Sequence, residues 1–152
     1  MPDDALVARG EGEPGVELME LLSESYSRIT RLINFELERE CSMPLSWFEV
    51  LVHLENANAD RLTMTQLASQ ISLTSGGVTR LVDRIAEAGF VERQNCPSDR
   101  RSVYVAITQK GKETLEGASM VYSSAVDRYL TTRLGRDECE RMSTALRKLS
   151  VP

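Results

Sequence analysis

The chain has 152 residues, a length that suits one domain or a subunit that completes its core by association. Its formal net charge of −5 gives no overall sign of a nucleic-acid partner. No apolar run approaches the roughly 20 residues that a membrane span needs, and the acidic N-terminus lacks a signal-peptide pattern, so we expect a cytoplasmic protein.

The N-terminal part of the sequence predicts a flexible tail and then two helices. Residues 1–15 are rich in Asp, Glu, Gly and Pro without periodicity, which is typical of a flexible segment. A helical apolar period begins at Val16 and ends near Arg39, and Pro44 marks the start of a second helix. The apolar stripe of the first helix consists of Leu18, Leu22, Tyr26, Ile29 and Ile33.

Two short helices are predicted in the middle of the chain, after a loop at 56–60. Thr65 is expected to cap the first helix, and residues 72–74 form a tight turn. The second helix extends to Ala88, and Gly89 stands where a left-handed residue ends a helix.

A β-hairpin is predicted next, because 90–94 and 102–107 have strand composition and 95–99 has turn composition. Two short helices joined by a three-residue turn and followed by a hairpin make a winged helix-turn-helix. The sequence therefore predicts a mainly α fold with a small β wing.

The C-terminal part predicts two more helices. Thr108 is expected to cap a long helix that ends near Leu134 at Gly135, and Asp137 with Glu140 resembles a capping box for the last helix. The last helix carries Cys139, Met142, Leu146 and Leu149 at the spacing of an apolar seam. Because helices this apolar gain most of their stability from packing, we expect the two chain ends to form a homodimer.

The stretch TSGGVTRLVDR, at 74–84, begins a helix with Gly76 and Gly77, although glycine costs roughly 0.8–1.0 kcal/mol relative to alanine there. Either the backbone must approach something large, or the helix merely starts loosely. In a winged helix-turn-helix this end of the helix enters the DNA major groove, so we favour approach to DNA. The segment 72–112 carries seven basic and four acidic residues, which leaves a charge of −8 on the remainder and favours the same interpretation.

The segments LSWFEVLVHL and MTQLASQISLTSGGVTRLVDRIAEAGFVERQNCPSDRRSVYVAITQKG, within 45–111, resemble the multiple antibiotic resistance regulator (MarR) family of bacterial repressors. The combination of TRLVDR, AGFVER, DRR and the Ile107-Thr108 pair before Lys110-Gly111 carries this resemblance. It implies a homodimer that binds a pseudo-palindromic operator and is often released by a small molecule or an oxidant. The double glycine departs from the more usual polar residues of the family, which puts the base preference in doubt.

The resemblance implies a DNA-binding set on the second short helix and on the wing. Ser75, Gly76, Thr79 and Arg80 match the major-groove positions, while Arg100 and Arg101 match the wing tip, with Asp99 as their structural partner. The full expected set is Thr74, Ser75, Gly76, Gly77, Thr79, Arg80, Arg84, Arg93, Asp99, Arg100 and Arg101.

A ligand pocket is a further expectation. Trp47, Phe48 and His53 are the candidate lining residues, with core or interface packing as the equal alternative for Trp47. Cys96 lies in the wing and is expected to be exposed, without a redox role. His53 is the only histidine, and we expect no metal and no cofactor.

We therefore expect one intertwined domain: a tail at 1–15, a helical dimerisation region at 16–40 and 108–152, and a winged helix-turn-helix at 41–107. The predicted function is a DNA-binding transcriptional repressor. No nucleophile with a base and no carboxylate pair indicates an enzyme. The alternative is a helical adaptor that binds protein through the same module.

Overall fold

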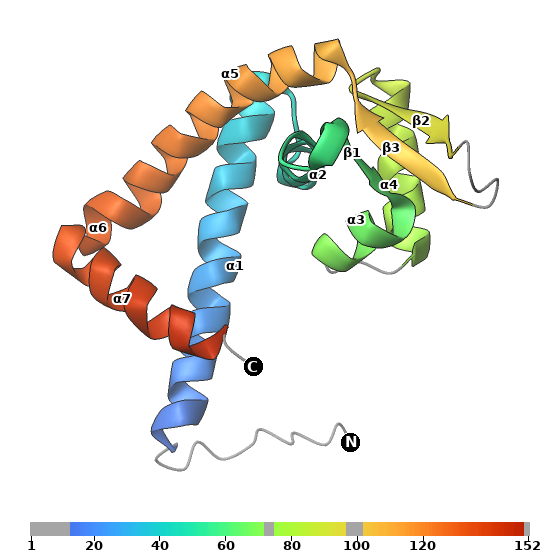
Figure 1. The fold of residues 1–152 in the computed structure, drawn as a ribbon. Coiled ribbons are helices and arrows are strands. Elements are labelled where there is room, and N and C mark those ends of the chain that lie inside the picture. The colour runs from blue at the N-terminus through green and yellow to red at the C-terminus, as the bar shows by residue number, and fades with distance from the viewer. Residues whose placement is uncertain (1–12, 72–74, 97–101, 151–152) are drawn as a thin grey trace, which may run out of the picture.

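The structure is a computed structural model that describes residues 13–71, 75–96 and 102–150. Long helices form a frame on one side of the molecule, and shorter helices with a small sheet form the other side (Figure 1). Every helix in the described ranges is too short or too polar to cross a membrane. The predicted turn at 72–74 and residues 1–12 of the predicted tail lie outside these ranges.

The first long helix, α1 (Pro14–Cys41), begins inside the predicted tail. Proline suits the first turn of a helix because its fixed φ is helical and its missing N–H has no partner there in any case. Ser42 ends the helix in the left-handed conformation, with φ of 51°, and donates its backbone N–H to Glu38. The helical apolar period therefore extends one turn further at its start than the sequence predicts.

The second long helix is built from α5 (Gln109–Val126), the π-helical turn η2 (Asp127–Thr131) and α6 (Thr132–Leu134). As predicted, Thr108 caps it by accepting a hydrogen bond from the Gly111 N–H at 3.0 Å, and Gly135 ends it with φ of 76°. The last helix, α7 (Arg136–Leu149), folds back toward α1 (Figure 1). The expected capping box at Asp137 is wrong, because α7 begins directly after Gly135 and no side chain caps it.

The helix-turn-helix unit consists of α2 (Leu45–Glu55), α3 (Met64–Gln70) and α4 (Ser75–Glu87). The predicted cap of α3 at Thr65 is wrong. The Thr63 hydroxyl accepts from the Gln66 N–H at 3.2 Å, while Gln66 Oε1 accepts from the Thr63 N–H at 2.9 Å. This capping box starts the helix earlier because residues 61–63 are already extended.

The sheet has three antiparallel strands in the order β1-β3-β2, namely β1 (Arg61–Thr63), β2 (Val91–Asn95) and β3 (Val103–Ile107). The hairpin of β2 and β3 confirms the prediction, with Val91 opposite Ile107. The sequence analysis missed β1, which pairs Leu62 with Val105. Three residues are too few to show strand periodicity, and the short 3-10 turn η1 (Asn58–Asp60) precedes them.

One buried apolar core joins the frame to the helix-turn-helix. Fully buried side chains come from α1, α2, α4, β3 and α5. They include Leu37, Leu51, Val82, Ile85, Val105 and Leu115. Gly89 ends α4 with φ of 81°, as the sequence predicts. The core thus holds α4 against the frame with its opposite face in solvent.

Candidate nucleic-acid interface

Helix α4 has a buried face and an exposed face, and the buried face determines which residues the helix presents. Val78, Val82 and Ile85 are fully buried, and Leu81 is half-buried, as the periodicity predicts. The exposed face carries Gly76, Thr79, Arg80, Asp83 and Arg84. A helix held by one apolar face offers the other to a partner without a change in the core.

Gly76 lies in the first turn of α4 and is exposed, whereas Gly77 is half-buried. A Cβ built on Gly76 meets no atom within 4 Å, and its φ lies outside the left-handed region. Neither packing within the chain nor backbone conformation therefore requires glycine at position 76.

Three arginines border this face. Arg80 and Arg84 form no ion pair or hydrogen bond with another described residue. Arg93 of β2 donates to Asp83 Oδ1 of α4 at 2.6 Å, so this guanidinium connects the wing to the helix. Two of the three cations are therefore uncommitted within the described chain, and the third has an acidic partner.

The hairpin strands keep their register up to the pair Asn95 and Val103. Beyond it, the Cys96 N–H donates to the Ser102 carbonyl at 3.1 Å. The remaining members of the expected DNA-binding set, Thr74, Asp99, Arg100 and Arg101, lie outside the described residues.

The expectation that Cys96 is exposed is wrong. The residue is only 8% exposed, because its backbone bond to Ser102 holds it against the sheet. Cys41 at the end of α1 is half-buried, and burial raises the pKa of its thiol, with the charge of Glu40 acting in the same direction. A raised pKa disfavours the reactive thiolate.

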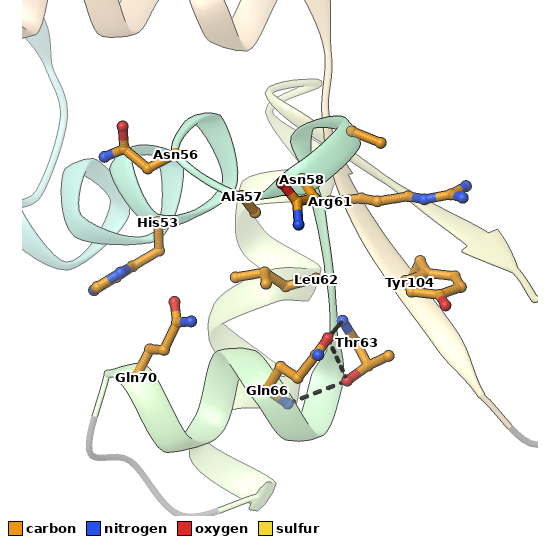
Figure 2. A pocket seen from close by; sticks show the side chains of 11 residues that line it. His53, Asn56, Ala57, Asn58, Arg61, Leu62, Thr63, Gln66, Gln70 and Tyr104 are labelled. Carbon is orange, nitrogen blue, oxygen red and sulfur yellow. Dashed lines mark hydrogen bonds between the residues drawn. The ribbon is translucent and has the colours of Figure 1, made fainter.

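The structure does not bring together the three predicted pocket residues. Trp47 packs edge-on against Phe90 with ring centroids 6.1 Å apart, and Phe48 is buried and stacks on Tyr122 at 4.6 Å. His53 alone lines a cavity of about 700 Å³ between α2, α3 and β1 (Figure 2). One helical turn before His53, burial raises the pKa of Glu49, and His53 opposes that shift.

A buried carboxylate in the helical frame was not found from the sequence. Glu36 of α1 is 6% exposed and accepts from the Tyr129 hydroxyl at 2.6 Å. Arg39 lies 2.7 Å and Arg128 3.3 Å from its carboxylate. The Tyr129 hydrogen bond, with the two arginines, holds the pKa of Glu36 below its ordinary value, although burial acts in the opposite direction. Only the spacing of Glu36 and Arg39 was visible beforehand, because the other partners are some 90 residues away.

The frame helices leave large apolar side chains exposed. Tyr26 of α1 is 67% exposed and Leu149 of α7 is 73% exposed. Further members are Val16, Leu18, Met19 and Leu21 on α1 and Met142 and Leu146 on α7. A groove of about 370 Å³ lies between α1, the end of the α5–α6 helix and α7. Within the predicted stripe, only Ile33 is buried by the chain itself.

Comparison with known proteins places residues 42–102 in a match to the MarR family model. Two curated relatives from Bacillus subtilis are similar to parts of the chain. The uncharacterized HTH-type transcriptional regulator YkoM is 32% identical over 88 residues, which are 58% of this chain and 56% of the relative. The HTH-type transcriptional repressor YetL is 36% identical over 69 residues, or 45% of this chain and 41% of the relative. The chain thus matches about half the length of these relatives.

The solved structures extend the likeness to most of the chain. The crystal structure of Sco3205 from Streptomyces coelicolor, a MarR family transcriptional regulator in complex with DNA, covers 91% of this chain. It is 25% identical, with a TM-score of 0.81 and coverage of 88% of its own chain. The frame helices are therefore part of the shared architecture, together with the helix-turn-helix.

Proposed function

Because this chain belongs to the MarR family of winged helix-turn-helix proteins, we propose that it is a sequence-specific DNA-binding transcriptional regulator. In the proposed form, a homodimer represses transcription from a pseudo-palindromic operator. The observation that carries this proposal is the exposed face of α4, where Gly76 has open space and Arg80 and Arg84 have no acidic partner among the described residues.

The proposed binding mode assigns two tasks to this face. The first turn of α4, from Ser75 to Arg80, lies against base edges in the major groove, with Thr74 and Gly77 beside the backbone. Arg84 and Arg93 contact phosphates, the latter after exchange with Asp83 or while bridged to it. Arg100 and Arg101 extend the contact to the minor groove, with Asp99 supporting the loop.

The proposed dimer interface supports the division of the chain into a helical region at 16–40 and 108–152 and a DNA-binding region at 41–107. The exposed apolar residues of α1 and α7 border one groove, which suits helices of a second copy. A dimer also matches the two half-sites of a palindrome, because its two α4 helices face successive major grooves.

Operator titration tests the proposal. Fluorescence anisotropy with an inverted repeat from the DNA beside the gene should give specific binding that weakens steeply with salt. Arg80→Ala should weaken that binding by about 1–3 kcal/mol. Arg136→Ala, at a side chain 90% exposed on α7, is the matched control and should bind normally.

The competing function is a protein-binding adaptor that uses the same module. In that case neither the inverted repeat nor unrelated DNA should bind in a salt-dependent manner, and Arg80→Ala should leave any residual DNA binding unchanged. Release of the repressor by a small molecule or an oxidant is part of the proposal, and burial of Cys96 favours the small molecule.

A further inference from the structure

The cavity of about 700 Å³ lies at the joint between the helical frame and the DNA-binding helices. Its walls come from the C-terminal end of α2, from η1 and β1, and from α3 (Figure 2). Helix α2 packs against α1 and α5 of the frame, whereas α3 packs against α4. A molecule in this cavity would therefore contact both units at once.

The chemistry of the lining is amide-rich and uncharged over most of its area. Asn56, Asn58 and Gln70 each offer an amide, and His53 offers one donor and one acceptor when it is neutral. These four side chains form no hydrogen bond with another described residue. In Figure 2, His53 extends from α2 toward α3, and Gln70 extends from α3 toward His53. The polar groups thus converge on the cavity from both units.

The remaining lining restricts the charge of a ligand. No carboxylate lines the cavity, and Arg61 is its one cation of fixed charge. Arg61 is already engaged by Gln94 at 3.3 Å and by the Tyr104 ring at 4.7 Å. Leu62, 8% exposed, provides an apolar surface between the polar groups. A cation finds no counter-charge in this lining, and an anion finds only a committed one.

The wall formed by η1 is fixed to the frame. Ala59 and Asp60 both have left-handed backbone, with φ of 57° and 53°, which non-glycine residues rarely adopt. The Asp60 carboxylate accepts from Lys112 Nζ of α5 at 2.5 Å. This ion pair holds one wall of the cavity in place, so a ligand would shift the opposite wall, which is α3.

We propose that this cavity binds a small uncharged molecule with several paired hydrogen-bond donors and acceptors, and that its occupancy changes the affinity of α4 for DNA. Each amide presents a donor beside an acceptor, so it matches either the edge of a heterocyclic base or the vicinal hydroxyls of a sugar. The regulatory part rests on the proposed DNA-binding function, whereas the binding part does not.

Calorimetric titration of the DNA-free protein tests the binding part. The probes are uracil, ribose and uridine, which separate the base from the sugar as the source of the recognised groups. Benzoate and putrescine are the anionic and cationic controls. We expect at least one uncharged probe to bind, with about tenfold or greater loss in Gln70→Leu and in Asn56→Leu. Gln109→Leu changes an exposed glutamine at the start of α5 and should bind as the wild type does.

Several outcomes would overturn the assignment: no binding of any uncharged probe, equal or tighter binding of a charged control, or unchanged binding in both cavity variants. Gln70 and Asn56 are exposed, so their substitution leaves the core intact, and thermal melts verify that each variant folds.

Operator titration with and without the bound probe tests the regulatory part. Linkage requires that the probe change the operator affinity by the same factor by which the operator changes the probe affinity. Probe binding with intact operator binding but no coupling would overturn the regulatory part. Probe binding without any operator binding would instead overturn the proposed function and leave the cavity assignment in place.

Discussion

Gly76 and Gly111 are both glycines in the first turn of a helix, but their surroundings differ completely. A Cβ on Gly76 would meet open space, whereas a Cβ on Gly111 would lie 2.2 Å from the Phe90 carbonyl oxygen. Gly111 is therefore required by close packing between α5 and the start of the wing. At Gly76 the chain itself supplies no such reason, which leaves the loose helix start and the approach to DNA as explanations.

The variant Gly76→Ala separates these explanations. Alanine favours the helix, so the free energy of unfolding should rise by up to about 1 kcal/mol. If α4 lies against the groove at this point, the added methyl group should lower operator affinity in the same preparation. Thermal melts and operator titrations measure the two effects. Unchanged affinity in a more stable protein would favour the loose start, and Gly111→Ala should be destabilised.

Glu36 predicts a pH dependence of stability. Its pKa in the folded protein is lower than its ordinary value of 4.5, so the ionised form stabilises the fold at neutral pH. This contribution should be lost as pH falls from about that value through the lower folded pKa.

The variant Glu36→Gln keeps the shape of the side chain and removes its charge. Denaturant unfolding should show a smaller free energy at neutral pH than in the wild type, and a shallower loss on acidification below pH 4.5. Glu38→Gln, on the exposed side of the same helix, is the control. Parallel pH profiles for Glu36→Gln and the wild type would contradict this role of the cluster.

At the scale of elements, the start of α3 illustrates how tertiary pairing changes a local prediction. Thr65 and Thr63 are both plausible caps by residue type. Pairing of β1 with β3 keeps residues 61–63 extended, and this gives Thr63 the backbone conformation that a cap requires, with φ of −69° and ψ of 157°. The helix therefore starts at Met64.

Alanine at each threonine tests this cap. Thr63→Ala should lower the free energy of unfolding by about 0.5–2 kcal/mol, because the Gln66 N–H loses its acceptor. Thr65→Ala changes an exposed residue inside the first turn and should alter stability by less than about 0.5 kcal/mol. Equal effects of the two variants in urea unfolding would contradict the assigned capping box.

At the scale of the whole molecule, the frame is incomplete in one chain. The predicted stripe of α1 is half covered: Ile33 lies in the core, whereas Leu18 and Tyr26 are more than half exposed. Exposed side chains of this size on two facing helices are typical of an association surface. Closure by a second copy would bury them without any change in the core around Leu51 and Leu115.

Sedimentation equilibrium measures this association. The wild type should be a dimer at micromolar concentration, with a total buried area above about 2,000 Å². Tyr26→Glu should shift it toward monomer, because a carboxylate in an apolar interface loses its hydration. Gln109→Glu adds the same charge at an exposed site at the other end of the frame and should remain dimeric. A folded wild-type monomer at micromolar concentration would refute the interface.

The sequence by itself determined the long helices, the hairpin and the division of α4 into its two faces. These features depend on periodicity, on Thr108 as a cap and on Gly89 and Gly135 as terminators, all of which are local. Tertiary structure alone decided the strand β1, the burial of Cys96, the ion pair of Asp83 with Arg93 and the network around Glu36. It also decided that His53 faces a cavity while Phe48 faces the core. Each of these depends on segments distant in the chain, and residue spacing does not encode which distant segment a side chain meets.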